Sequence, residues 1–536
     1  MSDRLFSLRK DRRPLYDRMA YGAVLAILGL FIVQSHPFMK IPYDAWEHLL
    51  RIASIYDEGK CFVFWPDDTR IECGWHAVWA ALFRLLDIND FFIWAEVIHT
   101  FQFFFTAIVM LYSTGILLSS LLPDLKDGEG KWLSLIAVIL WFLGNGTHSI
   151  EYQQAWIMWY SVNYQAIALP LFWYMAALTV LIICRNDLTA RQLTLNCLLI
   201  VVAALIIARV HPMELLYYFC YFWIVVLFFP DRLRHILTKY WVFAVVLLVV
   251  FVAVIAFGVE RQLPLKPLKE IIFAGGFNPL ALFDMIMAEG RAYLYENLSR
   301  YPSSFSEAAL FSLIAGLLSV CWISFDSLTR KRLNVRLFLS QTLATLLFFL
   351  IPLTVVGGGL MAMLTLFELV WRFFFAAPWF LLLPAVLYLL VRRLFPEAGP
   401  GWAVAGNVAC ILILVFISKG LMTGVLYENT RSILNALNPD KVGPYYTRED
   451  VARLDALISQ KKNPDPAKPA IYYIRGDLAY LVRGCLRRYV YTSRLHKPTR
   501  ESFFEAGLNR RYQLIDIDIG GDFPREDRIF RSFAFQ

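Results

Sequence analysis

Long apolar runs recur along most of this 536-residue sequence, and they constrain its fold more than any other feature. A helix that crosses a bilayer needs roughly 20 consecutive apolar residues, because its backbone polar groups must be satisfied inside the helix. Residues 20–33 and 240–258 are two clear runs of this kind, and only 18% of the residues are charged. The chain is therefore predicted to be an all-α polytopic membrane protein.

About eleven membrane-spanning helices follow from the apolar runs when the chain is read from end to end. No small-residue cleavage site follows the first run, so we interpret it as a retained anchor rather than a signal peptide. The spans are predicted near residues 18–36, 93–121, 132–145, 163–184, 193–210, 213–229, 240–258, 306–325, 337–356, 369–391 and 402–424.

The distribution of positive charge predicts the orientation of the chain. Arg9, Lys10, Arg12 and Arg13 precede the first span, which places the N-terminus in the cytosol by the positive-inside rule. The other loops that this assignment puts in the cytosol are also basic. They carry Lys126, Lys131, Arg185, Arg191, Arg232, Arg234, Lys239, Arg330, Lys331, Arg332, Arg336, Arg392 and Arg393. Topology accounts for the net charge of +8, so nucleic acid is not an expected partner.

An odd number of spans puts the last part of the chain on the outer side of the membrane. Residues 1–424 are predicted to form the transmembrane domain, including the outer loops 37–92 and 259–305. Residues 425–536 have a more polar composition and are predicted to form a small soluble α/β domain. Its expected elements are strands at 470–474 and 512–519 and helices at 477–488 and 502–509.

The two outer loops contain stretches with helical spacing. In the first loop, residues 43–59 and 74–90 alternate apolar and polar residues at helical spacing, so each is expected to lie along the membrane surface. The second loop has helical character around residues 279–297. Outer loops of this composition are candidates for a functional site.

Asp44 and Glu47 lie three residues apart in the first of these stretches, so a helix would place them on one face. Two such carboxylates could act as a general base and as a metal or acceptor ligand, and His48 would extend the group. The alternative is a solvated interfacial helix in which Glu47 pairs with Arg51. A divalent metal is a possible cofactor, and no zinc-spaced cluster, P-loop, GxSxG or GxGxxG motif is present.

Arg209, His211 and Glu214 form a second group at the outer turn between the fifth and sixth spans. Ionisable residues at a membrane boundary are often functional, although capping and snorkelling explain them equally well. Arg372 lies at the beginning of the tenth span between aromatic residues. Its guanidinium suits a phosphate, and snorkelling is again the alternative.

Other outer residues carry weaker signals. Basic residues of the second outer loop could bind an anionic headgroup or simply contact lipid. They are Arg261, Lys266, Lys269 and Arg291. Glu151 lies among aromatic residues that could stack on a sugar, although aromatic residues are common at membrane interfaces. Cys61 and Cys73 lie in the first outer loop, in what should be an oxidising compartment, and are predicted to form a disulfide; two unpaired thiols are the alternative.

The order of these features resembles that of the GT-C superfamily of membrane glycosyltransferases, which use polyprenyl-phosphate-linked sugars. The stretch PYDAWEHLLRIASIYDEGK (42–60) is similar to their acidic first outer loop. GWHAVWAALFRLLDINDFFIWAEVIHTFQFFF (74–105) resembles their second amphipathic helix and the span that follows. WRFFFAAPWFLLLPAVLYLL (371–390) resembles the late arginine-aromatic span of the aminoarabinose and protein-mannosyl transferase type.

The resemblance implies an inverting transfer of one sugar from a polyprenyl phosphate to a glycan, lipid or protein acceptor on the outer face. Asp44 would be the catalytic acidic residue, and Glu47 would support it or help bind a metal. The donor phosphate would be bound by Arg372 and Arg209, with contributions from His211, Lys266 and Lys269. Supporting or acceptor-binding residues would be His48, Glu214 and Glu151.

Two departures from the family pattern limit what it implies. The family often has adjacent acids or acid-x-acid, whereas this chain has Asp44-x-x-Glu47, so the identity of the base and the need for a metal stay open. The WWDYG signature is absent, so transfer of whole glycans to asparagine is not expected. A bacterial inner membrane, with the C-terminal domain in the periplasm, is expected by analogy.

Two other classes of function compete with this one. A transporter or flippase of a lipid-linked glycan would place its ionisable residues near the bilayer midplane, whereas here most lie at the outer boundary. A glycan polymerase or ligase would concentrate its functional residues in one large late outer loop. The carboxylates of the first loop favour the transferase.

Overall fold

The computed structural model of the chain describes most of the predicted spans but not all of them. The predicted spans 18–36 and 240–258 lie outside the described residues, as do Glu151, Arg261, Lys266 and Lys269. The described residues are 43–66, 73–125, 127–147, 154–155, 162–185, 187–239, 278–297, 307–364, 367–395, 400–420, 427, 430–431, 448–461, 463, 465–474, 478–491, 500–505 and 507–517.

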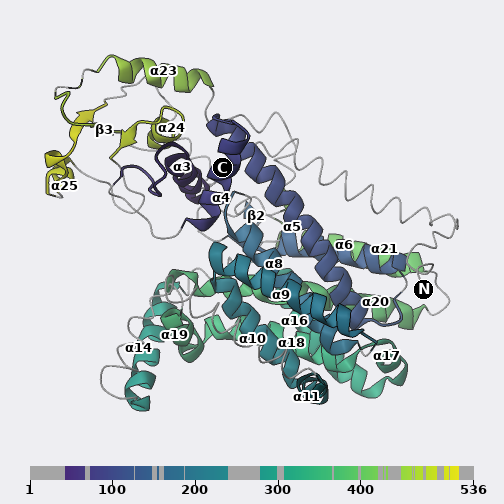
Figure 1. Ribbon diagram of the computed structural model, residues 1–536. Coiled ribbons are helices and arrows are strands. Elements are labelled where there is room, and N and C mark those ends of the chain that lie inside the picture. The colour runs from purple at the N-terminus through teal and green to yellow at the C-terminus, as the bar shows by residue number, and fades with distance from the viewer. Residues whose placement is uncertain are drawn as a thin grey trace.

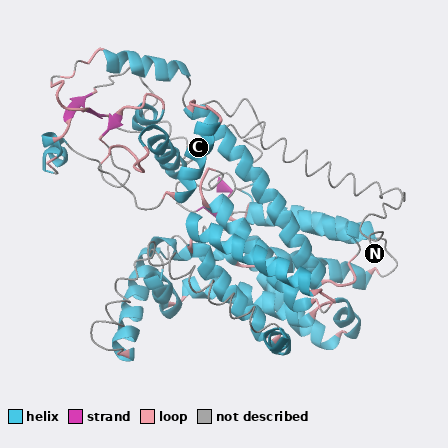
Figure 2. Cartoon of the chain, in the orientation of Figure 1, coloured by secondary structure: helices cyan, strands magenta, loops and turns pink. Residues whose placement is uncertain are grey.

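A bundle of apolar helices makes up the larger part of the molecule (Figures 1 and 2). By length and composition, five helices could cross a membrane: Phe91–Leu121, Gln165–Cys184, Ala190–Val210, Ala308–Phe325 and Val335–Leu353. The prediction of a helical, multi-pass membrane protein is therefore confirmed. The bundle helices are α5 (Phe91–Leu121), α6 (Asp127–Gly144), α8 (Gln165–Cys184), α9 (Ala190–Val210), α10 (Met213–Leu227), α16 (Glu307–Phe325), α18 (Val335–Leu353), α20 (Trp379–Leu394) and α21 (Pro400–Ser418).

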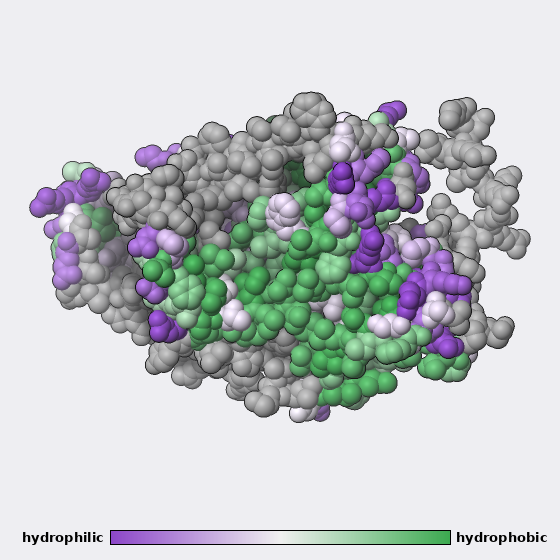
Figure 3. Space-filling view, turned by 90° about the horizontal axis from the view of Figure 1, so that it is seen from below, coloured by the Kyte–Doolittle hydropathy of each residue, from purple (hydrophilic) through white to green (hydrophobic). Residues whose placement is uncertain are grey.

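The helices differ in how much of their apolar surface faces outward. The apolar part of α8 is 72% buried, whereas that of α9 is only 28% buried, so α8 is central and α9 lies at the rim. Figure 3 shows a broad apolar area over one face of the bundle. Large apolar side chains such as Leu205, Trp223 and Phe416 are exposed. An apolar area of this kind is expected where lipid covers the protein.

Local signals account for where several helices begin. Asp90 accepts hydrogen bonds from the backbone nitrogens of Phe92 and Ile93 at the start of α5. Thr189 forms a capping box at the start of α9, and Asn334 caps α18. These side chains satisfy backbone N–H groups that have no partner inside the helix.

The predicted tenth span is divided in the structure, which corrects the expectation of one continuous helix over 369–391. Residues Phe367–Ala376 form the 3₁₀ helix η2, and α20 begins only at Trp379. Pro378 lies between the two as the N-cap residue of α20, a place where its missing N–H removes no hydrogen bond of the helix. Arg372 therefore lies on η2, before the spanning helix.

Shorter helices lie at the ends of the bundle. The basic helices α11 (Pro230–Lys239) and α17 (Ser327–Arg332) lie at the end opposite α3 (Tyr43–Glu58) in Figure 1. The helical character expected at 279–297 appears as α14 (Pro279–Asn297), which packs on α19 (Val355–Leu364). These two approach closely at Gly290 and Gly359, where a Cβ atom would meet backbone carbonyl oxygens below 2 Å.

The C-terminal lobe, residues 448–517, is a small α/β unit. Its parallel sheet has the strand order β4-β3-β5, with Ile471 opposite both Tyr489 and Leu514. The strands are β3 (Ala470–Tyr473), β4 (Tyr489–Val490) and β5 (Gln513–Asp516), and the helices are α23 (Arg448–Ser459), α24 (Leu478–Gly484), α25 (Arg500–Glu505) and η4 (Leu508–Arg510). A separate two-residue pair, β1 (Gly146–Thr147) and β2 (Gln154–Ala155), is antiparallel.

The sequence predicted β3, β5 and α24 but missed α23 and β4. The helix expected at 502–509 is shorter, because Gly507 takes a left-handed conformation with φ 68° and separates α25 from η4. A two-residue edge strand such as β4 is too short for a periodic signal.

The lobe shares its hydrophobic core with the segment predicted to form the first outer loop. Trp46 and Ile52 of α3 and Trp94 of α5 belong to the same buried cluster as Leu481 and Ile515. α4 (Gly74–Leu85) contributes Trp75, Trp79 and Phe83 to it. A three-stranded sheet of this size needs a partner to cover its apolar face, and the first outer loop provides that partner.

Candidate functional site

Helix α3, in the predicted first outer loop, carries two carboxylates that the sequence singled out, those of Asp44 and Glu47. The Glu47 side chain is buried, and its Oε2 lies 3.5 Å from Nη2 of Arg51. The pairing that the sequence offered as an alternative is present, but within a protein core instead of on a solvated helix. Asp44 lies on α3 one turn earlier, and its side chain is outside the described part of the structure.

Two histidines meet where α3 packs on α4. Nδ1 of His48 lies 2.8 Å from Nε2 of His76, and both side chains are 2% exposed. Helix α4 approaches α9 closely at Gly74, where a Cβ atom would lie 2.8 Å from the carbonyl oxygen of Arg209. A larger residue at position 74 would separate these helices, so Gly74 helps to bring the two outer segments together.

Tyr164 connects the histidine pair to the second predicted group. Its ring meets the ring of His48 edge-on at 4.8 Å and stacks on the ring of His211 at 4.7 Å. Nδ1 of His211 lies 2.5 Å from Oε2 of Glu214, which is fully buried. The other carboxylate oxygen accepts a hydrogen bond of 3.4 Å from Gln165.

Further hydrogen bonds join this cluster to α5 and α8. Trp75 donates to Gln102 at 2.9 Å, and Gln102 donates to the carbonyl oxygen of Asn163 at 3.1 Å. The side chain of Asn163 accepts from the backbone nitrogen of Gln165. We call the whole group the buried polar cluster. It consists of Glu47, His48, Arg51, Trp75, His76, Gln102, Asn163, Tyr164, Gln165, His211 and Glu214.

The sequence predicted only part of this cluster. Glu47, His48, His211 and Glu214 were singled out and lie in it, whereas Arg209 is exposed on the last turn of α9. His76, Asn163 and Tyr164 were missed. Gln102 and Gln165 lie inside predicted spans, and a polar residue in an apolar span is the signal that could have found them.

The electrostatics of the cluster favour a neutral imidazole at His76. Burial lowers its pKa well below the usual value of 6.5, and electrostatic interactions with His48 and Arg51 lower it further. Among the described residues, Nδ1 of His76, Nε of Arg51 and Oε1 of Gln165 are buried without a hydrogen-bond partner. Buried polar atoms are normally satisfied, so these atoms are available to water or to a bound polar molecule.

Cys61 and Cys73 form a disulfide beside the cluster, with a Cα–Cα distance of 6.3 Å. Their sulfur atoms and a ring nitrogen of His76 lie within 4.8 Å of one another, and in the described part of the chain this is the one group of three possible metal ligands. Metal binding by cysteine requires the thiolate, so the disulfide-bonded sulfurs do not fit a metal site. The possible metal ligands are drawn only from the described side chains, and that of Asp44 is not one of them.

Arg372 lies on η2, next to a residue that contacts α10. The ring of Phe373 lies 4.6 Å from that of Tyr217, one helical turn after Glu214 on α10. Arg372 itself is half-buried. Arg291, on α14, is exposed, and its Nε donates to the carbonyl oxygen of Met287, so it lies on a different element from the cluster.

Comparisons with known proteins identify structural neighbours but no sequence family. No family profile and no curated protein match the chain. It is similar to structures of the oligosaccharyltransferase of Archaeoglobus fulgidus, one with Zn and sulfate (TM-score 0.44) and one with an inhibitory peptide and a dolichol-phosphate (TM-score 0.47). Both are 12% identical and cover 87% and 89% of this chain.

The chain spans less than two thirds of these oligosaccharyltransferase structures, 62% and 64% of their lengths. It is also similar to apo ArnT from Cupriavidus metallidurans, with 13% identity, a TM-score of 0.40 and coverage of 94% of this chain and 91% of that one. These neighbours are GT-C membrane glycosyltransferases, the superfamily that the sequence resembles. Identities of 12–13% and TM-scores of 0.40–0.47 assign no substrate and no residue role to this chain.

Proposed function

We propose that this protein is an inverting glycosyltransferase that moves a single sugar from a polyprenyl-phosphate donor to an acceptor on the outer face of the membrane. The observation that carries the proposal is the buried polar cluster, which gathers two carboxylates, three histidines and Arg51 at one end of an apolar helix bundle. Burying ionisable groups in a membrane protein costs free energy, and such groups are commonly retained for function.

The residues on α3 suit the chemistry of sugar transfer. The acceptor hydroxyl loses its proton to a carboxylate, Asp44 in our proposal, while its oxygen forms a bond to the anomeric carbon. The bond from that carbon to the phosphate oxygen breaks at the same time, and polyprenyl phosphate leaves with the electron pair. Glu47, His48 and the His211–Glu214 pair act as supporting residues.

The donor phosphate needs cations close to the membrane boundary. Arg209 is exposed at the end of α9, beside the start of α4, and Arg372 lies on η2 before α20. We propose both as phosphate-binding residues, because guanidinium groups can stabilise the charge that develops on a leaving phosphate without donating a proton. The acceptor class, glycan, lipid or protein, is left to experiment, as is a bacterial inner-membrane location with the C-terminal lobe in the periplasm.

A transporter or flippase of a lipid-linked glycan is the alternative. Such proteins place ionisable residues near the bilayer midplane. In the described bundle, α8 has no charged residue, and the charges of α9, α16 and α18 lie in their first or last turns. The middle of these helices is therefore without charge, which favours chemistry at a membrane boundary over passage through the middle.

The test is donor consumption by the purified protein in lipid nanodiscs with a panel of polyprenyl-phosphate sugars. We expect wild type to release polyprenyl phosphate, and Asp44→Asn to lower kcat by about 1,000-fold while donor binding persists. The matched control is Glu449→Gln, which changes an exposed carboxylate on α23 and should leave activity unchanged. Donor flipping in vesicles without consumption, equal in all variants, would support the transporter instead.

A further inference from the structure

We infer that the C-terminal lobe is a positioning element for α3, and that Arg483 and Arg487 hold this helix at the angle its carboxylates need. The inference rests on the proposed function and assigns a role to a part of the chain that takes no part in the transfer itself. It makes Arg483 and Arg487 positioning residues, not catalytic ones.

The lobe contacts α3 along much of its length. The ring of Tyr480, on α24, lies 6.2 Å from that of Trp46, the residue before Glu47. The same ring lies 5.3 Å from Phe64, which follows α3 in sequence. Helix α24 thus packs beside both the carboxylate-bearing part of α3 and the loop behind it.

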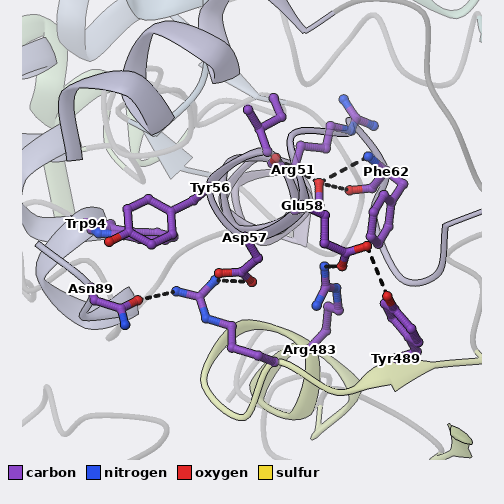
Figure 4. Close-up of polar contacts among 12 residues, drawn as sticks. Arg51, Tyr56, Asp57, Glu58, Phe62, Asn89, Trp94, Arg483 and Tyr489 are labelled. Atoms are coloured by element: carbon purple, nitrogen blue, oxygen red, sulfur yellow. Dashed lines mark hydrogen bonds and ion pairs between the residues drawn. The ribbon is translucent and has the colours of Figure 1, made fainter. Parts of the chain in front are cut away.

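Arg483 binds the last residue of α3. Its Nη2 lies 3.3 Å from Oε1 of Glu58, and the hydroxyl of Tyr489 donates to Oε2 of the same carboxylate at 3.0 Å (Figure 4). The Arg483 side chain is 1% exposed, and its guanidinium lies over the ring of Phe62 at 4.9 Å. An unpaired guanidinium buried to this degree would strongly destabilise the fold, and Glu58 is its partner.

Arg487 binds Asp57, the residue before Glu58. Its Nη1 lies 3.4 Å from Oδ2 of Asp57, and its Nη2 donates to Asn89 at 3.4 Å. The guanidinium also lies 4.6 Å from the ring of Trp94. Its backbone is left-handed, with φ 56°, a conformation that residues other than glycine rarely take and that persists where surrounding contacts hold it.

Helix α3 needs these cations because of its own charge pattern. Asp57 and Glu58 stand at its C-terminal end, and its last turn holds no basic residue. Carboxylates at that end interact unfavourably with the helix dipole, so α3 by itself would fray there. The two arginines of the lobe neutralise both carboxylates and so complete the helix end.

A continuous helix transmits this constraint to the proposed site. Glu47 and Glu58 are separated by eleven residues, which is roughly 16 Å along the axis. Asp44, Glu47, Arg51 and Glu58 are spaced by three, four and seven residues, so they share one face of α3. A rotation of α3 at Glu58 therefore turns Asp44 and Glu47 as well, and it moves His48 relative to His76.

The test compares Arg483→Gln with Arg483→Lys and with Arg448→Gln. Arg448 also joins the lobe to the rest of the chain, 2.7 Å from Asp90, but its side chain is 73% exposed, so it is the matched control. We expect Arg483→Gln to lower kcat by roughly 10- to 100-fold, since small displacements of reacting groups have effects of this size. The KM values for donor and acceptor should stay within about twofold, and Arg483→Lys should recover part of the loss.

Hydrogen exchange of the α3 amides, residues 43–58, gives a second readout that does not depend on activity. We expect faster exchange in Arg483→Gln and unchanged exchange in α8 and α16. If Arg483→Gln does not fold, Glu58→Gln changes the same ion pair on the α3 side, and Arg487→Lys changes the neighbouring pair with Asp57 on the lobe side.

The outcomes separate the two proposals. If Arg483→Gln raises the acceptor KM and leaves kcat unchanged, the lobe binds acceptor. If hydrogen exchange in α3 is the same in Arg483→Gln as in Arg448→Gln, Arg483 does not hold α3 in place. Either result overturns the inference. If wild type transfers no sugar but α3 exchange still rises in Arg483→Gln, the proposed function fails while the mechanical coupling stands.

Discussion

Nδ1 of His48 faces Nε2 of His76 across 2.8 Å in a buried contact. In a hydrogen bond between two imidazoles, one nitrogen must donate and the other must accept, so at least one of the two rings is neutral. The pair joins α3 to α4. The packing of these two helices therefore depends on one ring staying unprotonated at the nitrogen that accepts the hydrogen bond. This dependence has a direct consequence for the response of the protein to pH.

The first prediction concerns acid. Burial lowers the pKa of His76 below its usual value of 6.5, so the unfolded chain takes up a proton at a higher pH than the folded one. Stability is therefore fully present above about pH 6.5 and is lost as the pH falls from there through the folded-state pKa. We expect the thermal unfolding midpoint to drop between pH 7.5 and 5, and to drop less in His76→Gln.

His235→Gln is the control for this experiment, because His235 is exposed on α11. It should show the full acid sensitivity of wild type. If the unfolding midpoint drops equally in wild type and His76→Gln, protonation of His76 does not cause the loss of stability in acid.

The second prediction concerns the His211–Glu214 pair. Nδ1 of His211 and Oε2 of Glu214 are 2.5 Å apart, and the carboxylate is fully buried. A double-mutant cycle with His211→Asn and Glu214→Gln should give a coupling free energy of about 1–3 kcal/mol in thermal or denaturant unfolding. A coupling near zero would contradict the contact. Arg209→Gln, at the exposed end of α9, should change stability by less than about 0.5 kcal/mol.

The third prediction concerns the disulfide. Cys61 and Cys73 are twelve residues apart, and closing a loop of this length stabilises a protein by about 3 kcal/mol in the chain-entropy account. The Cys61→Ser/Cys73→Ser variant should therefore unfold at a lower temperature than wild type, and reductant should have the same effect on wild type alone. Cys321→Ser, which changes an exposed thiol, is the control. Peptide mapping under non-reducing conditions that recovers both thiols would refute the disulfide.

The fourth prediction concerns Gly484 at the end of α24. A Cβ atom there would lie 2.5 Å from Cζ of Phe91 at the start of α5, so alanine overpacks the contact between lobe and bundle. We expect Gly484→Ala to destabilise the protein by about 1–3 kcal/mol and to speed proteolysis within residues 448–517. Gly115→Ala adds its Cβ at 3.6 Å from Ser134 Oγ, an ordinary contact, so it should have no such effect. Equal proteolysis of the two variants would show that the lobe does not depend on this approach.

The apolar pattern predicted the bundle, because a helix that lies in lipid requires a run of consecutive apolar residues, which can be seen directly in the sequence. Spans expected at 163–184 and 193–210 appear as α8 and α9, and the expected helix at 279–297 appears as α14. The strand expected at 470–474 likewise appears as β3. The break between η2 and α20 was missed because hydropathy does not register a local change of helix type at Pro378.

The sequence by itself determined which segments are apolar enough to be buried and which polar residues interrupt them, since each of these is a property of neighbouring residues. Only the tertiary structure decided how those polar residues are paired. His48 meets His76 across 28 residues, Gln165 meets Glu214 across 49, and Arg483 meets Glu58 across 425. A buried polar group must find a partner, but helix packing selects that partner through close approaches such as that of Gly74 to Arg209, which no spacing along the chain encodes.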